Sequence, residues 1–362
     1  MQRKHYIDNL RLMCILLLIP YHAAMAWNVW GEGNYILLGQ SRILSSLVVG
    51  VSTWYMTLLF LLAGISARYS LQRRSYGKFA KERVLKLLLP LLMGTVTVMP
   101  ILCFIADRTN CGYQGSFWEH YPVFFTKWTD ITGYDGGFSI GHLWFLLYLF
   151  VISMVSLSII SLQRKQFKNA AFQNVNATVV LIFTLLALAL SRVELGGKSI
   201  LTYLLLYLLG YFVLSEETVI DRLQRGRYLY LILWIVFSVV NVYCFLWSER
   251  DYGIVNQAMS YGAGCFGIMT LLSVGKNVLN RTHRMGQFLS AQSFLIYIFH
   301  FPWVVALQYV LSTVTSNTAL IFGVSTVCAF SATILTSTLV KNIPVVNVLF
   351  GVKKRNLKRE AS

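Results

Sequence analysis

The sequence combines a high content of apolar residues with a strong positive charge. Its 362 residues are 56% hydrophobic and only 12% charged, the mean hydropathy is +0.61, and the formal net charge is +17. Apolar runs long enough to cross about 30 Å of hydrocarbon as helices recur along the chain, which excludes an ordinary water-soluble globular domain. These runs lack the alternation over about ten residues that is typical of an outer-membrane barrel, so we expect an all-α polytopic membrane helix bundle.

Ten membrane-spanning helices are predicted from the apolar runs. In chain order they lie near residues 11–29, 47–67, 84–106, 142–162, 177–192, 199–215, 228–247, 254–274, 292–312 and 318–340. We interpret residues 5–340 as one membrane domain and residues 341–362 as a basic cytoplasmic tail.

The distribution of Lys and Arg predicts the orientation of the spans, because cytoplasmic loops of membrane proteins carry an excess of both. With both termini placed in the cytoplasm, the inner segments hold 25 of the 31 basic residues. The exceptions are Arg42, Arg108, Lys127, Arg192, Lys198 and Arg250. The net charge is therefore a signal of topology, and we expect contact with the lipid bilayer and no nucleic-acid partner.

Motifs for metals, nucleotides and redox chemistry are missing from the sequence. It has no HExxH, P-loop, GxGxxG or paired acidic cluster, so neither a metal nor a bound cofactor is expected. Its six cysteines form no CxxC pair. Cys103 and Cys111 flank the outer end of the third predicted span, and a disulfide between them is left open.

Two ionisable residues in the first predicted span indicate a candidate site. Arg11 and His22 are eleven residues apart, which on a helix is about 20° more than three full turns and about 16 Å of rise. They therefore share one face, with Arg11 at the cytoplasmic boundary and His22 at mid-depth, where ionisable groups are costly and by default functional. The alternative is that Arg11 only anchors the helix at the interface and His22 only packs against a neighbour.

A processing signal offers another interpretation of this span. A basic start, the apolar core "LMCILLLIP" and then "AMA" have the form of a cleaved signal peptide. Cleavage after Ala26 would remove His22. We favour a retained first helix, because the apolar run continues towards Trp27 and Trp30.

Four segments resemble the acyltransferase-3 family of integral-membrane acyltransferases. "RKHYIDNLRLMCILLLIPYHA" is similar to the first helix of the family, which carries Arg and, after ten residues, His. "FLLAGISARYS" resembles its Ser-Gly segment, with Ala63 where Ser is common, and "FAKERVLKLLLP" resembles its basic loop, with Lys86 where Arg is common. "SFLIYIFHFPWV" resembles its Tyr-x-x-His-x-Pro segment. A fifth segment, "GHLWFLLYLF" at 141–150, is most similar to the branch containing the glucan succinyltransferase of osmoregulated periplasmic glucan synthesis.

The resemblance implies an O-acyltransferase of the cell membrane. In a bacterium this would be the cytoplasmic membrane. It implies transfer of an acyl group, acetyl or succinyl, from cytosolic acyl-CoA to a hydroxyl of a carbohydrate-type acceptor in the cell envelope. His22 would act as a base or as an acyl relay, and these two mechanisms are left open. The phosphates of the donor would be held by Arg11, Arg68, Arg83 and Lys86.

Further residues have secondary roles in this interpretation. Asp8 lies three residues before Arg11 and is expected to orient its guanidinium, unless it serves only the start of the helix. His142, beside Trp144 at the outer interface, is a candidate for contact with the acceptor. His300 is a second candidate, and its ring is also suited to bonding a backbone carbonyl that Pro302 leaves free.

The longest outer segment, about 107–141, is rich in aromatic residues, glycines and polar groups that suit a carbohydrate. The polar residues of this kind are Glu119, His120, Asp130 and Asp135. We expect a polar cavity leading from Arg11 past His22 towards this segment. The alternative function is that of a multi-span transporter or exporter, for which a buried ionisable group is also useful. The identity of the acyl group, the identity of the acceptor and the oligomeric state are left open.

Overall fold

The computed structural model describes residues 4–32, 35–128, 137–163, 175–281 and 283–352. These residues form helices and connecting turns, without a β-strand among them, so the predicted all-α polytopic membrane bundle is confirmed. Asp130, Asp135 and the tail from residue 353 onward lie outside the described residues.

Eight helical segments within the described residues are long and apolar enough to cross a membrane. They are His5–Met25, Arg42–Leu71, Tyr76–Asn110, Gly141–Gln163, Arg227–Trp247, Gly253–Val278, Ser293–Ser312 and Thr318–Asn342. The other two predicted spans are also helical. The span expected near 177–192 is the shorter apolar helix Ala177–Arg192, and the one expected near 199–215 is Ile200–Phe212, which bends by 104° into Glu217–Arg225.

The chain folds as two compact units. Unit 1 comprises residues 1–32, 38–79 and 151–290, and unit 2 comprises residues 33–37, 80–150 and 291–362. The helix α4 (Tyr76–Arg83) and the helix α8 (Trp144–Gln163) each begin in one unit and end in the other. Each unit therefore contains segments that are far apart in the sequence.

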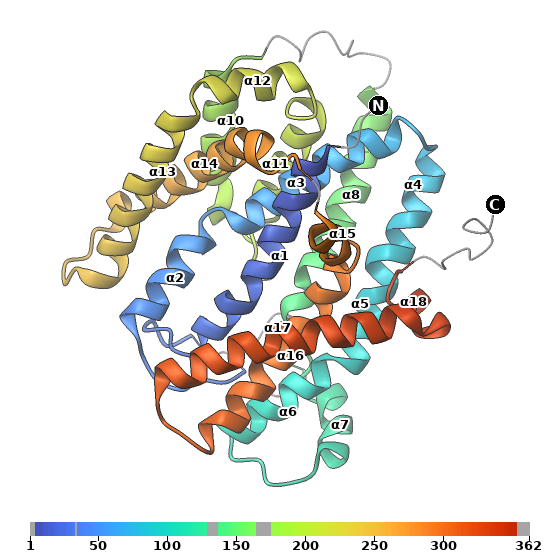
Figure 1. The fold of residues 1–362 in the computed structure, drawn as a ribbon, viewed down its shortest axis with the longest axis vertical. Helices are drawn as coiled ribbons and strands as arrows, with labels where there is room; N and C mark the ends of the chain where they lie inside the picture. The colour runs from blue at the N-terminus through green and yellow to red at the C-terminus, as the bar shows by residue number, and fades with distance from the viewer. Residues whose placement is uncertain (1–3, 33–34, 129–136, 164–174, 282, 353–362) are drawn as a thin grey trace. The chain divides into compact units, whose positions relative to one another are not determined.

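Unit 1 holds the first helix and most of the central part of the chain (Figure 1). Its helices are α1 (His5–Met25), α2 (Arg42–Ser52), α3 (Tyr55–Leu71), α10 (Ala177–Ala189), α11 (Ile200–Phe212), α12 (Glu217–Arg225), α13 (Arg227–Val242), α14 (Gly253–Val278) and α15 (Arg284–Ser290). A 3₁₀ turn at Leu190–Arg192 extends α10, and a π-helical turn at Tyr243–Trp247 extends α13.

Unit 2 holds the short helices that follow residue 80 and two long helices from the last part of the chain (Figure 1). Its elements are a π-helical turn (Val84–Leu88), α5 (Leu89–Thr97), α6 (Met99–Asn110), α7 (Phe117–Thr126), a 3₁₀ turn (Gly141–Leu143), α16 (Ser293–Ser312), α17 (Thr318–Asn342) and α18 (Pro344–Leu349). The long helices α16 and α17 pack along each other, and α6 packs against both α16 and α7.

The helix α1 belongs to the core of unit 1. It packs against α2, α3, α14 and α15, and its side chains Leu10, Cys14 and Ile19 are fully buried. Near its start, the Asn9 amide donates hydrogen bonds to the carbonyl oxygens of Leu279 and Arg281, which follow α14. These contacts fix the beginning of the helix that carries both Arg11 and His22.

Two glycines allow α3 and α11 to approach at backbone distance. A Cβ atom on Gly64 would overlap the carbonyl oxygen of Tyr207, and a Cβ atom on Gly210 would overlap the carbonyl oxygen of Leu61. Small residues at such crossings are the usual way for membrane helices to pack closely. The crossing holds α3 in place, and with it the residues after Gly64 that face α1.

The disulfide between Cys103 and Cys111 that the sequence left open does not form. The thiol of Cys103 is buried and donates to the carbonyl oxygen of Gly137, whereas Cys111 is exposed. Because α6 continues to Asn110, eight residues of helix separate the two cysteines by about 12 Å. A disulfide needs Cα atoms less than about 7 Å apart.

Candidate functional site

Arg11 is held on both sides by polar side chains of unit 1. Its Nη1 atom lies 3.3 Å from Oδ1 of Asp8, one turn earlier on α1, and its Nη2 atom donates to Oγ of Ser66 on α3 at 2.6 Å. The Ser66 hydroxyl donates in turn to the carbonyl oxygen of Leu62. Since that hydroxyl proton is committed to Leu62, the Ser66 oxygen is presented to Arg11 as an acceptor. The guanidinium is thus fixed in place.

His22 lies near the other end of α1, in a half-buried position. Its ring packs edge-on against Tyr21 with centroids 5.2 Å apart, and Tyr21 in turn contacts Tyr55 of α3 at 5.0 Å. The Tyr21 hydroxyl lies 3.1 Å from the hydroxyl of Ser52 at the end of α2. The histidine therefore sits where α1 meets the α2 and α3 segment, on the helix whose start carries Asp8 and Arg11.

A cavity of about 360 Å³ opens among the helix ends of unit 1. It is lined by Lys4, Tyr6, Arg68, Tyr69, Gln72, Ser215, Glu216, Glu217, Thr218, Lys276 and Asn280. These residues come from the start of α1, the end of α3, the bend between α11 and α12, and the end of α14. Arg68 is therefore a cavity residue, and Ser66, two residues before it, links the same stretch of α3 to Arg11.

Each cation of the cavity faces a carboxylate at or near the start of α12. Lys4 pairs with Glu217 at 2.9 Å, and Arg68 lies 3.9 Å from Glu216. Lys276 pairs with Asp221, which is one turn beyond Glu217 on α12.

Lys4 is the cavity lysine that lies outside the membrane-spanning segments. Burial lowers its pKa, but hydrogen bonds to Tyr69 and Glu217 and their charges outweigh burial, so the pKa of Lys4 lies above its ordinary value. Its ammonium also lies 4.8 Å from the centroid of the Tyr69 ring. Lys4 is therefore a stable positive charge at neutral pH.

The other two residues expected at the donor belong to unit 2. Arg83 is the half-buried last residue of α4. Lys86 lies in the π-helical turn that follows, with its ammonium 3.5 Å from Oε2 of Glu82. Such π-helical turns are rare and frequently occur at functional sites. The four cations expected at the donor are thus divided, two in each unit, as Arg11 and Arg68 belong to unit 1.

His142 and His300 meet in the core of unit 2. Their ring centroids are 5.4 Å apart, and both side chains are buried. The Nδ1 atom of His300 lies 2.7 Å from the carbonyl oxygen of Tyr297, and Nε2 of His142 lies 3.0 Å from that of Ile298. A carbonyl only accepts, so both nitrogens carry protons.

Pro302 explains the contact of His142. In an α-helix the carbonyl of Ile298 would accept from the N–H group four residues later, and proline has none. The ring of His142 supplies the missing donor from another helix. The Tyr297 hydroxyl donates to the carbonyl oxygen of His142 and so forms a second hydrogen bond between the same two segments.

Trp144, which lies two residues after His142, is half-buried and packs against Tyr148 with ring centroids 5.4 Å apart.

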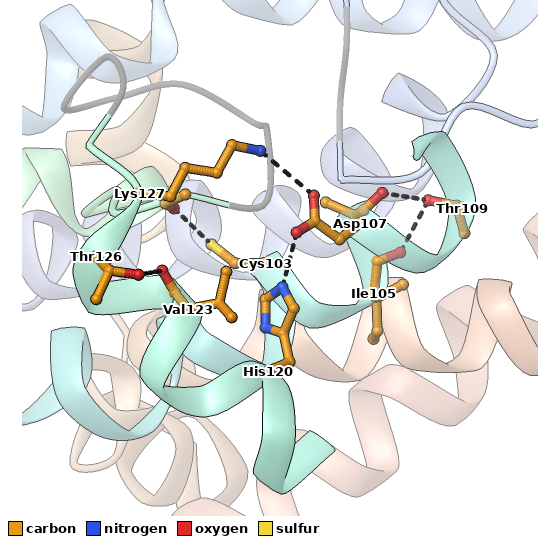
Figure 2. Close-up of polar contacts among 10 residues, drawn as sticks. Cys103, Ile105, Asp107, Thr109, His120, Val123, Thr126 and Lys127 are labelled. Carbon is orange, nitrogen blue, oxygen red and sulfur yellow. Dashed lines mark hydrogen bonds and ion pairs between the residues drawn. The ribbon is translucent and has the colours of Figure 1, made fainter. Parts of the chain in front are cut away.

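Another cluster of polar side chains in unit 2 lies between α6 and α7 (Figure 2). Nε2 of His120 lies 2.8 Å from Oδ2 of Asp107, and Nζ of Lys127 lies 3.6 Å from Oδ1 of the same carboxylate. The His120 side chain is fully buried, and its ring makes T-shaped contacts with the rings of Phe104 and Tyr113. This group binds α7 to α6, within the segment where the sequence predicts contact with a carbohydrate.

Several residues of these sites were not predicted from the sequence. Ser66 had a detectable signal, because it follows Ala63 by one helical turn and so offers a hydroxyl on the face where the related family has serine. The sequence carries no such signal for Glu217 and Lys276, since they reach the cavity only through the packing of α12 and α14 against each other.

Comparison with known proteins identifies the family of the chain. Residues 4–340 match the family model of acyltransferase family 3, described as an acyltransferase domain. The chain belongs to the acyltransferase-3 family. It is therefore a multi-span membrane acyltransferase, which disfavours the alternative of a transporter. No match was found among curated proteins or among solved structures.

Proposed function

We propose that this acyltransferase moves an acyl group, acetyl or succinyl, from cytosolic acyl-CoA to a hydroxyl of a carbohydrate-type acceptor in the cell envelope. The observation that carries the proposal is the arrangement of α1. Arg11 is fixed by Asp8 and Ser66 on the same helix as His22, and a polar cavity lined by three cations lies at the start of that helix.

The donor end of the reaction suits these cations. Coenzyme A carries phosphates, and guanidinium and ammonium groups are the usual protein partners of phosphate. Arg11 and Arg68 of unit 1 are assigned to the donor, together with Arg83 and Lys86 of unit 2. The placement of this end in the cytoplasm follows from the excess of Lys and Arg in the inner segments.

His22 is assigned to the chemical step. As a base, its neutral imidazole takes the proton of the acceptor hydroxyl while the oxygen attacks the thioester carbon, and the thiolate of coenzyme A leaves. As a relay, the imidazole nitrogen first takes the acyl group and then passes it to the hydroxyl. Both routes end in an ester and free coenzyme A thiol. His142, Trp144 and His300 are assigned to the acceptor side.

The test is a reaction of the purified protein, reconstituted in lipid nanodiscs, with labelled acetyl-CoA and succinyl-CoA. We expect specific binding of at least one donor and release of free thiol that increases when a carbohydrate acceptor is added. A protein that neither binds coenzyme A nor releases thiol from either donor would contradict the proposal, and a carrier would behave in that way.

A further inference from the structure

The cations of the unit 1 cavity are less exposed than two of the acids that pair with them. The side chains of Lys4, Arg68 and Lys276 are 19%, 17% and 19% exposed, so the cations form the inner lining. Those of Glu217 and Asp221 are each 57% exposed and lie towards solvent. Glu216, the partner of Arg68, is only 23% exposed and stays within the lining. Glu217 and Asp221 can therefore rotate towards solvent at little cost, whereas the cations stay in the lining.

Two of the cations, Lys4 and Arg68, are also held by aromatic rings, independently of their acidic partners. Lys4 contacts Tyr69, and the guanidinium of Arg68 lies 5.4 Å from the centroid of the Tyr211 ring. Tyr69 is fixed in turn by a hydrogen bond from its hydroxyl to the carbonyl oxygen of Ser215. If the carboxylates moved away, Lys4 and Arg68 would therefore keep their positions.

The ligand indicated by this lining is an anion with several oxygen atoms. Three cations from three helices converge on one cavity, and the amino-terminal end of α12 adds the positive end of its dipole. A group bearing one or more phosphates would satisfy all of them, because each phosphate offers several acceptor oxygens.

The geometry points to a phosphate-binding site whose cations are occupied, in the free protein, by the carboxylates of α12. Binding exchanges the contacts of Glu217 with Lys4 and of Asp221 with Lys276 for contacts with phosphate. The carboxylates are therefore internal competitors of the ligand. The phosphate belongs either to the acyl-CoA donor, in which case the inference rests on the proposed function, or to the headgroup of an anionic lipid.

This competition has a consequence that an ordinary structural salt bridge would not have. Removing the negative charge of Glu217 should tighten binding of the ligand. Exposed ion pairs contribute little, so we expect a gain of about two- to fivefold from Glu217→Gln. Lys4→Gln and Lys276→Gln should each weaken binding several-fold, because they remove a contact with phosphate.

The experiment measures binding of coenzyme A to the full chain in phosphatidylcholine nanodiscs by calorimetry. The variants are Glu217→Gln, Lys4→Gln and Lys276→Gln. The controls are Glu249→Gln and Arg250→Gln, which make the same changes of charge at exposed positions outside the cavity lining. A gain in affinity cannot arise from misfolding, so Glu217→Gln remains informative even if the lysine variants are unstable. A second arm replaces phosphatidylcholine with phosphatidylglycerol and measures the shift in melting temperature.

Tighter binding of coenzyme A by Glu217→Gln, with unchanged controls, supports the inference and identifies the donor as the source of the phosphate. If phosphatidylglycerol raises the melting temperature of Glu217→Gln more than that of the wild type, while the affinity for coenzyme A is unchanged, the inference is supported with the lipid as the source of the phosphate. If Glu217→Gln leaves both ligands unaffected or binds them more weakly, the inference is overturned. Turnover of acyl-CoA by the wild type, measured on the same samples, tests the proposed function separately.

Discussion

The guanidinium of Arg11 donates to Oγ of Ser66 at 2.6 Å, and this bond joins α1 to α3 at the candidate active site. Asp8 holds the other side of the same guanidinium. An arginine restrained in this way needs little reorganisation to bind a donor phosphate. Ser66 thereby takes a positioning role on the face of α3 where Ala63 offers no hydroxyl.

Ser66→Ala should lower kcat/KM for acyl-CoA by about fivefold, which corresponds to roughly 1 kcal/mol for one hydrogen bond. The effect should fall mainly on KM, because the contact concerns binding of the donor. Steady-state kinetics over a range of acyl-CoA concentrations measures the split. Ser66→Thr keeps the hydroxyl and should stay close to the wild type. Equal activity of the alanine and threonine variants would show that the Ser66 hydroxyl has no role in binding the donor.

Gly64→Ala should destabilise the protein strongly, because its Cβ atom would overlap the backbone carbonyl of Tyr207 at the crossing of α3 and α11. We expect a loss of about 1–3 kcal/mol or more, as for other overpacked sites. Thermal unfolding in detergent measures the change. Gly323→Ala in α17 is the control, since a Cβ atom there meets nothing within 4 Å, and it should be neutral or slightly stabilising.

His142→Phe should destabilise unit 2, because it leaves the carbonyl of Ile298 without a donor. The expected cost is about 1–2 kcal/mol for an unpaired polar group in a membrane protein. Pro302→Ala supplies an N–H group to that carbonyl, so the double variant should be less destabilised than the sum of the single variants. Unfolding free energies of the wild type, the two single variants and the double variant form a double-mutant cycle that measures this coupling. Strict additivity would show that His142 is not retained for this bond.

The start of α7 should loosen in acid. The N–H group and the hydroxyl of Ser116 bond Glu119 and lower the pKa of its carboxyl below the ordinary 4.5. A carboxyl whose pKa is lowered on folding stabilises above its unfolded pKa, and this contribution is lost as the pH falls through the folded value. The protection of the α7 amides against hydrogen exchange, measured relative to the intrinsic exchange rate at each pH, should therefore decrease below pH 4.5. Glu119→Gln retains the capping pattern and should remove this pH dependence.

The sequence predicts the helices well because hydropathy and length determine whether a segment can cross a membrane. Arg11 and His22 are likewise assigned to one face by helical periodicity alone. The cavity of unit 1 differs from the one that the sequence predicts, because neither Arg11 nor His22 is among its lining residues. Its lining was not predictable, because Lys4, Arg68 and Lys276 are brought together by packing between helices that are far apart in the chain. The 104° bend after α11 was also missed, since an apolar run does not indicate where its helix turns.

Unit 2 shows the same limit. Pro302 correctly indicates that a carbonyl of α16 needs another donor, and the expected donor was the ring of His300. In the structure His300 bonds Tyr297, and the carbonyl of Ile298 is taken by His142, which is 156 residues away in the sequence. Local patterns identify the unsatisfied group but not its partner, because the partner depends on tertiary packing.

The most direct test of the account is the rate of thiol release from acyl-CoA by His22→Ala in nanodiscs with a carbohydrate acceptor present. Loss of a general base or an acyl relay should reduce kcat by about 10²-fold or more. Expression, membrane insertion and melting temperature should stay close to those of the wild type, because His22 is only half-buried. Activity within about threefold of the wild type, well short of that loss, would contradict the assignment of His22 to the chemical step.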